Sequence, residues 1–170
     1  MPPPPQNFEQ IVHDYYGDVF RFALSLVGTQ SDAIDLTQQA FLRYASKGHQ
    51  LRDQTKVKNW LFRGLKNEFI DQKRRSKRYQ HVNLDTVPIN SLPLASNSRF
   101  STIDTGSALR ALQSLDEKYR IPLTLFYLEG LSYRDIAGLM DIPEGTVMSR
   151  LSRGKERLRC AFSSPTQPQP

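Results

Sequence analysis

The chain has 170 residues, of which 38% are hydrophobic, and this length allows one ordinary domain or two small ones with thin cores. Its formal net charge of +6 suits a polyanionic partner, either nucleic acid or an acidic membrane surface, although basic proteins of many kinds share such a charge. A single cysteine excludes an internal disulfide and any multi-thiolate metal site, and no apolar stretch approaches the roughly 18 residues that a membrane span requires.

Three amphipathic helices are predicted in the first half of the chain. The first begins at Phe8 and closes at Gly28, because its apolar residues recur at three- and four-residue steps. The second starts with Ser31 as its N-cap and ends at Gly48. The third carries one apolar stripe, made of Val57, Trp60, Leu61, Gly64, Leu65 and Phe69. No segment alternates with period two over a useful length, so strands are not expected.

The third helix is strongly basic. Nine lysines or arginines stand within residues 56–78, where Glu68 and Asp71 are the acids. Single-stranded nucleic acid is bound by charge along its backbone and by rings that stack on its bases, and Trp60 and Phe62 lie in this segment. Trp60 also falls on the apolar stripe, which favours a core position for it. The basic run at the end of the helix could be a solvated surface, but its density favours phosphate contact.

The periodic pattern disappears from about Tyr79 to Gly106, where prolines, serines and asparagines interrupt scattered apolar residues. This composition predicts a flexible linker of about 27 residues, which would span roughly 25–30 Å on average. Its leucines could dock on a partner. A further helix is expected from Asp116 to Leu128, where Pro122 predicts a kink or an early boundary.

A helix-turn-helix is predicted between Leu131 and Arg159. Ser132, with Asp135 three residues later, resembles a capping box, and Pro143 suits the first position of the second helix. The second helix has an apolar face of Val147, Leu151, Gly154 and Leu158. Its opposite face carries Met148, Ser149, Ser152, Arg153 and Glu156. Such a face fits the major groove of DNA, and an ordinary solvated helix is the alternative.

The remaining residues predict no site of their own. The proline-rich start lacks the features of a secretory signal, and the tail after Phe162 is expected to be disordered. Cys160 is interpreted as a small packing residue rather than a redox sensor. The three histidines have no ligand spacing, so we expect no metal and no cofactor, and a soluble, cytoplasmic protein.

Three stretches resemble, in order, the conserved regions of extracytoplasmic-function (ECF) sigma factors, a subfamily of the sigma-70 RNA polymerase sigma factors. Residues 32–43 resemble region 2.2, residues 58–75 resemble regions 2.3 and 2.4, and residues 130–151 resemble region 4.2. The resemblance implies an all-α chain of two small helical domains joined by a flexible linker. Region 2 would occupy residues 8–78, the linker 79–106 and the region 4 helix-turn-helix 107–162, with disordered tails at 1–7 and 163–170.

The resemblance also implies a function and a set of sites. The chain would direct core RNA polymerase to promoters and help open the −10 element, under an anti-sigma factor and without catalytic residues of its own. Contacts to the β′ clamp of the polymerase would come from Asp32, Asp35, Gln38, Gln39 and Arg43. Contacts to the −10 element would come from Lys56, Lys58, Asn59, Trp60, Arg63, Lys66, Asn67, Lys73, Arg74, Arg75 and Arg78.

Region 4 would sit on the β flap and read the −35 element. The implied DNA contacts are Arg134, Thr146, Met148, Ser149, Arg150, Ser152, Arg153, Lys155 and Arg157. Met148 stands where the family often has Arg or Lys, and Asp116 replaces a proline that usually opens the region 4 core. These two departures leave the −35 sequence unpredicted.

Three other functions are possible, and the two basic surfaces argue against one of them, an anti-sigma or scaffold protein. A stand-alone helix-turn-helix regulator would explain residues 108–162 and would bind palindromic DNA as a dimer, but it leaves the basic helix without a purpose. A small nucleic-acid enzyme is not supported, because no paired carboxylates, Cys/His site or phosphate-binding glycine loop stands in the sequence.

Overall fold

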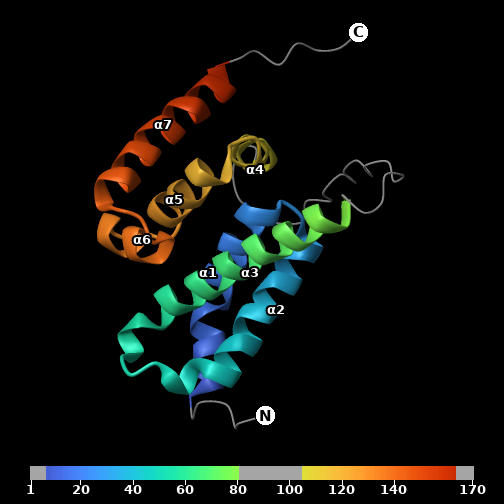
Figure 1. Cartoon of the computed structure of the whole chain (residues 1–170), viewed down its shortest axis with the longest axis vertical. Coiled ribbons are helices and arrows are strands. Elements are labelled where there is room, and N and C mark those ends of the chain that lie inside the picture. Colours follow the sequence, from blue (N-terminus) through green and yellow to red (C-terminus); the bar gives the residue numbers. More distant parts are fainter. Residues whose placement is uncertain (1–6, 81–104, 164–170) are drawn as a thin grey trace. The chain divides into compact units, whose positions relative to one another are not determined.

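The computed structural model describes residues 7–80 and 105–163. The chain divides into two compact units, one comprising residues 1–23 and 29–99 and the other residues 24–28 and 100–170. Every regular element within the described residues is a helix, as Figure 1 shows, which confirms the all-α prediction. None of these helices is long and apolar enough to cross a membrane. Most of the predicted linker and the tail after residue 163 lie outside the described residues.

The first unit is built on three long helices. They are α1 (Phe8–Val27), α2 (Gln30–Lys47) and α3 (Val57–Gln80), with the short 3₁₀ turns η1 (Gly48–Gln50) and η2 (Gln54–Lys56) between the last two. Helix α2 packs against α3. The apolar stripes predicted for the helices are buried, and Val19, Ala33, Val57, Leu61 and Leu65 are inaccessible to solvent. The three helices therefore share one hydrophobic core.

The start of α2 differs from the prediction. The N-cap is Thr29 and not Ser31, because the Thr29 hydroxyl accepts a hydrogen bond from the Asp32 backbone N–H at 3.3 Å. The same hydroxyl donates to the Asp32 carboxylate at 2.7 Å, so the two side chains satisfy each other. Gly28, which has a positive φ of 82°, separates this cap from the end of α1. The N-cap of α2 therefore lies two residues earlier than the sequence suggested.

The two rings of the basic segment have different surroundings. Phe62 is fully buried, with its ring centroid 5.1 Å from that of Phe22 in α1, so it cannot stack on a base. Trp60 is half-buried and packs edge-on against Tyr44 of α2, with 5.5 Å between the ring centroids. A core contact for Trp60 is thus present, while part of its ring remains accessible.

Besides the end of α1, the described residues of the second unit form α4 (Thr105–Gln113), α5 (Glu117–Tyr127), α6 (Tyr133–Met140) and α7 (Glu144–Ser163). Asp116 caps α5 by accepting from the Lys118 backbone N–H at 3.1 Å. The early boundary expected at Pro122 is wrong, since α5 runs through it to Tyr127. Pro122 is buried among Ile121 and Leu123, and this packing compensates for the backbone hydrogen bond that proline cannot make.

Helices α6 and α7 form the predicted helix-turn-helix. Ser132 caps α6, its hydroxyl accepting from the Asp135 N–H at 3.1 Å and donating to the Asp135 carboxylate at 2.6 Å, which confirms Ser132 as the N-cap. The turn contains Asp141 in the left-handed conformation, with φ 58°. Helix α7 begins one residue after Pro143, whose carbonyl accepts from the Thr146 N–H at 2.9 Å and from the Val147 N–H at 3.2 Å.

The interior face of α7 matches the prediction, and one neighbouring residue does not. Val147, Leu151 and Gly154 are buried, and Leu158 is half-buried. Cys160, interpreted as a packing residue, is exposed instead. It follows Leu158 by two residues, which turns its side chain about 160° around the helix from the buried face.

Candidate nucleic-acid and protein interfaces

The basic side of α3 points away from the core. At about 100° per residue, most of the predicted −10 residues of this helix fall opposite the buried stripe that begins at Val57. Arg63, Asn67 and Arg74 are exposed on that side, and Asn59 and Lys66 are half-buried. Lys73 is exposed at the border of the buried stripe, with its ammonium 5.4 Å from the ring centre of Phe69. A continuous basic helix face of this kind can follow the phosphates of one nucleic-acid strand.

Lys58, predicted to contact DNA, is bound within the first unit. Its ammonium lies 2.8 Å from the Asp18 carboxylate of α1, and both side chains are only 27% exposed. Arg21 binds the other oxygen of Asp18. Burial alone would raise the pKa of the Asp18 carboxyl, but hydrogen bonds and positive charge from Lys58 and Arg21 outweigh it and lower that pKa. Lys58 therefore ties the start of α3 to α1.

The short turn before α3 is also capped by an acid. Asp53 accepts hydrogen bonds from the Thr55 hydroxyl at 2.6 Å and from the Thr55 N–H at 3.0 Å, and these bonds lower the pKa of its carboxyl. Lys56 is exposed, with its ammonium 3.6 Å from Asp53. This order in the turn fixes where the chain enters α3, while Lys56 remains accessible to a phosphate.

The outward face of α2 carries the residues predicted to bind protein. Asp32, Asp35, Gln38 and Gln39 are exposed, and Arg43 is half-buried. The prediction omitted Leu42, which is 59% exposed on the same face. Its signal in the sequence is its place off the buried stripe, at three and four residues from Gln39 and Gln38.

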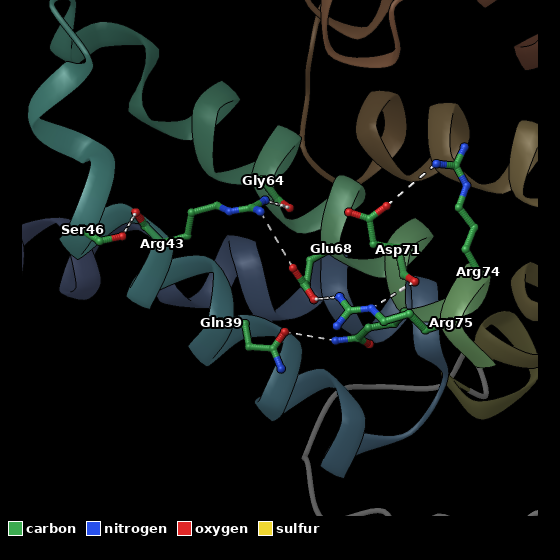
Figure 2. Close-up of polar contacts among 9 residues, drawn as sticks. Gln39, Arg43, Ser46, Gly64, Glu68, Asp71, Arg74 and Arg75 are labelled. Atoms are coloured by element: carbon green, nitrogen blue, oxygen red, sulfur yellow. Dashed lines mark hydrogen bonds and ion pairs between the residues drawn. The ribbon is translucent and has the colours of Figure 1, made fainter. Parts of the chain in front are cut away.

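The far side of that face is joined to α3 by polar contacts, which Figure 2 shows. The Arg43 guanidinium donates to the Gly64 carbonyl at 3.4 Å and lies 4.0 Å from the Glu68 carboxylate. Arg75 donates to the other oxygen of Glu68 at 3.0 Å. These contacts bring together one residue predicted for polymerase, Arg43, and one predicted for DNA, Arg75, around an acid for which the sequence suggested no role.

Helix α7 presents the predicted −35 residues in the second unit. Met148, Ser149, Ser152, Arg153 and Lys155 are exposed, whereas Thr146 and Arg150 are half-buried. Arg157 is exposed as well, but its guanidinium lies over the ring of Tyr119 in α5, 4.6 Å from the ring centre. The exposed face of α7 is thus basic and carries small polar side chains. Arg157 borders this face and stacks on Tyr119 of the same unit.

Arg134, the predicted contact from α6, lines a shallow hollow next to the turn. The hollow is formed by Arg134, Ala137, Gly138, Asp141, Ile142, Pro143 and Glu144. Arg134 therefore lies beside the start of α7, in the position from which a side chain of the first helix can reach a phosphate.

Exposed apolar residues near the start of α6 were not predicted. Tyr127 is 58% exposed and Leu128 51% exposed at the end of α5, and Tyr133 is partly exposed at the start of α6. The Tyr133 ring stacks with that of Phe126, with 5.1 Å between centroids. The sequence signal is the unbroken aromatic and apolar run that ends α5, longer than one buried face can accommodate.

Comparison with known proteins places both units in one family. A family model for sigma-70 region 2 matches residues 11–79, and one for sigma-70 region 4 matches residues 105–158. The ECF RNA polymerase sigma factor SigM of Bacillus subtilis is 33% identical over 158 residues, which cover 92% of this chain and 96% of that protein. The ECF RNA polymerase sigma factor SigE of Mycolicibacterium smegmatis is 34% identical over 161 residues, 90% of this chain and 60% of that one.

A solved structure is similar over almost the whole chain. It is the sigma factor RpoE in complex with the anti-sigma factor NepR from Bartonella quintana, 28% identical in sequence. The match covers 95% of this chain and 99% of that one, with a TM-score of 0.85. The fold similarity therefore extends over both units and is not confined to the widespread helix-turn-helix.

Proposed function

Because this chain belongs to the ECF subfamily of the sigma-70 RNA polymerase sigma factors, we propose that it binds core polymerase and directs it to promoters through two DNA surfaces. The single observation that carries the proposal is the presence of region 2 and region 4, in family order, each with an exposed basic face. A stand-alone helix-turn-helix regulator is not favoured, since it accounts for region 4 only.

In the first unit, we assign the outward face of α2 to the β′ clamp of the polymerase. Asp35, Gln38 and Gln39 supply polar contacts, and Leu42 adds an apolar anchor. The basic side of α3 is assigned to the −10 element, where arginines and lysines follow the backbone of the melted strand. Trp60, half-buried at the start of that side, is available to a base only on its accessible part.

In the second unit, we assign the exposed face of α7 to the major groove of the −35 element. Arg153 and the serines at positions 149 and 152 can reach base edges, while Lys155 and Arg134 can bind phosphates. Met148, 55% exposed, can contact a thymine methyl group but cannot donate a hydrogen bond to a base. We assign the exposed apolar residues near α6 to the β flap.

The partner set follows from the same proposal. The structural relative is described in complex with an anti-sigma factor, and we propose that an anti-sigma factor also controls this chain. If the chain binds promoters with polymerase, it acts in the cytoplasm. The chain supplies no catalytic residue, because bond formation belongs to the polymerase.

The proposal is tested with purified full-length chain and bacterial core polymerase on a genomic promoter library, at moderate salt. We expect protection and melting near −10 and a second contact near −35, only when both components are present. Leu42→Asp, a charge placed on an exposed side chain, should abolish the footprint by preventing polymerase binding while leaving helix content unchanged. Tight palindromic binding by the chain alone, unaffected by polymerase, would show that it is a stand-alone regulator.

A further inference from the structure

Arg75, one of the predicted DNA residues of α3, has its guanidinium held against its own helix. Its Nη2 donates to Oε1 of Glu68 at 3.0 Å, and its Nε donates to the backbone carbonyl of Asp71 at 3.4 Å. Both acceptors precede Arg75 on the same helix, by seven and four residues. The side chain therefore bends back along the helix and is held there at two points.

Helical periodicity separates Arg75 from Lys66, Lys73 and Arg63, although Arg78 lies only about 60° from it around the helix. At about 100° per residue, its Cα lies roughly 180° around the helix from Lys66, about 160° from Lys73 and about 120° from Arg63. A nucleic-acid strand that follows the phosphate-facing side of the helix passes the latter three residues. Arg75 starts on the side that borders α2, and its bonds to Glu68 and to the Asp71 carbonyl hold its guanidinium away from that strand.

The acid that holds Arg75 is partly buried and shared. The Glu68 side chain is 20% exposed, and its second oxygen lies 4.0 Å from the Arg43 guanidinium of α2. One turn further along, Gln72 donates to the Gln39 side chain of α2 at 3.0 Å. Figure 2 shows Glu68 between the two arginines, at the seam of the two helices. Arg75 is thereby continuous with the face of α2 that carries Gln39 and Arg43.

We propose that Glu68 is a positioning residue that commits Arg75 to the protein-binding face shared by α2 and α3, and withholds it from promoter DNA. Two guanidiniums share one carboxylate here, so the cluster keeps a net positive charge and suits a partner that offers a carboxylate. The identity of that partner as core polymerase rests on the proposed function; the withholding of Arg75 from DNA does not.

The DNA half of the inference is tested by the salt dependence of binding to a labelled single-stranded oligonucleotide, using the full chain. Because log K falls as log salt rises, slopes of log K against log salt are compared by their magnitude. Arg63→Gln should lower the slope by about 0.7, the value for one phosphate contact on a single strand. Arg75→Gln should leave the slope unchanged. Glu68→Gln should raise the slope by about 0.7 through the released Arg75, and Glu68→Gln with Arg75→Gln should cancel that gain.

Asp71→Asn is the matched control for charge. It adds the same unit of positive charge to α3, but the partner of Asp71, Arg74, is 3.9 Å away and 72% exposed. We expect a smaller change in slope than for Glu68→Gln, because Arg74 is already available to a phosphate. A slope for Arg75→Gln as low as that for Arg63→Gln, or equal effects of Glu68→Gln and Asp71→Asn, would overturn the withholding of Arg75.

The protein half is tested by binding of the same variants to core polymerase without DNA. Arg75→Gln should weaken that binding about two- to fivefold, as expected for one exposed ion pair, while Arg63→Gln should leave it unchanged. Wild-type affinity for Arg75→Gln would overturn the assignment of Arg75 to the protein face. If the wild-type chain does not bind polymerase at all, the proposed function fails, and the oligonucleotide measurements still decide whether Glu68 withholds Arg75.

Discussion

Gly154 lies where α7 comes closest to α5. A Cβ atom at this position would stand 2.8 Å from Cδ1 of Leu123 and 3.2 Å from Cβ of Tyr119. The leucine methyl can rotate, but the Tyr119 Cβ is fixed to its backbone. Overpacking of a core costs about 1–3 kcal/mol, and alanine regains about 1 kcal/mol over glycine in a helix. We therefore expect Gly154→Ala to destabilise the second unit by about 1 kcal/mol.

Hydrogen exchange of peptides from α5 and α7 measures this effect, and Gly145→Ala is its control. A Cβ at Gly145 meets nothing within 4 Å, so the same substitution in the same helix should stabilise it by up to about 1 kcal/mol. Trp60, the single tryptophan, reports on the first unit and should be unaffected by either change. Equal protection in both variants would mean that the close packing of α5 on α7 has no energetic consequence.

Asp18 makes the first unit sensitive to acid. Its pKa in the folded chain is below the ordinary value of 3.8, so the stability it contributes is present above that value and is lost as pH falls through the folded pKa. At pH 7 we expect Asp18→Asn to cost about 1 kcal/mol, through weaker bonds to Lys58 and Arg21. Below 3.8 the difference between variant and wild type should shrink.

Urea unfolding followed by Trp60 fluorescence, repeated from pH 7 to pH 3, measures that difference. Because the wild-type carboxyl becomes protonated as the asparagine variant stays neutral, the two unfolding curves should converge in acid. A gap that stays constant over this range would assign the effect of the substitution to packing and not to the ion pairs.

At the scale of elements, the helices could be predicted because each carries one apolar stripe at helical spacing. The stripes of α3 and α7 are buried where periodicity placed them, with Val57 and Val147 both inaccessible. The N-cap at Ser132 could also be predicted, because its bond joins residues only three positions apart. Both predictions use residues that are close in the sequence. Such predictions hold in the folded chain when the hydrophobic pattern favours the same helix.

What could not be predicted depends on contacts between helices or on a choice between equal local signals. Phe62 is off the predicted stripe of α3, yet it is buried because α1 supplies Phe22 against it. Thr29 and Ser31 are both good N-caps, and only the bond to the Asp32 N–H selects one. The part of Glu68 in the candidate site likewise requires the packing of α2 on α3, which no spacing in the sequence reveals.

The choice of cap for α2 can be measured directly. Thr29→Ala removes the hydroxyl that accepts from the Asp32 N–H and should cost about 1 kcal/mol of stability in the first unit. Ser31→Ala changes an exposed position inside the first turn and should be neutral or slightly stabilising, since alanine favours helix. Chemical unfolding monitored by Trp60 fluorescence compares the two. A larger loss for Ser31→Ala would restore Ser31 as the cap.

At the scale of the whole molecule, the two proposed DNA surfaces belong to separate compact units. Arg63 of α3 and Arg153 of α7 are exposed, and each lies on the face assigned to one promoter element. Substitutions that share no partner and act on independent sites usually add in free energy. The two surfaces should therefore act on promoter binding as a linked pair of independent contacts, in which each raises the effective concentration of the other.

Arg63→Ala and Arg153→Ala test this arrangement in the complex with core polymerase. Loss of one charge-assisted contact costs about 1–3 kcal/mol, or roughly 5- to 150-fold in promoter affinity, and the double variant should lose the sum of the two free energies. The footprints should differ, because Arg63→Ala weakens melting near −10 while Arg153→Ala weakens protection near −35. Promoter binding should also be measured without polymerase. If Arg153→Ala then lowers promoter affinity by the same factor and Arg63→Ala has no effect, region 4 binds DNA on its own and the proposed arrangement is wrong.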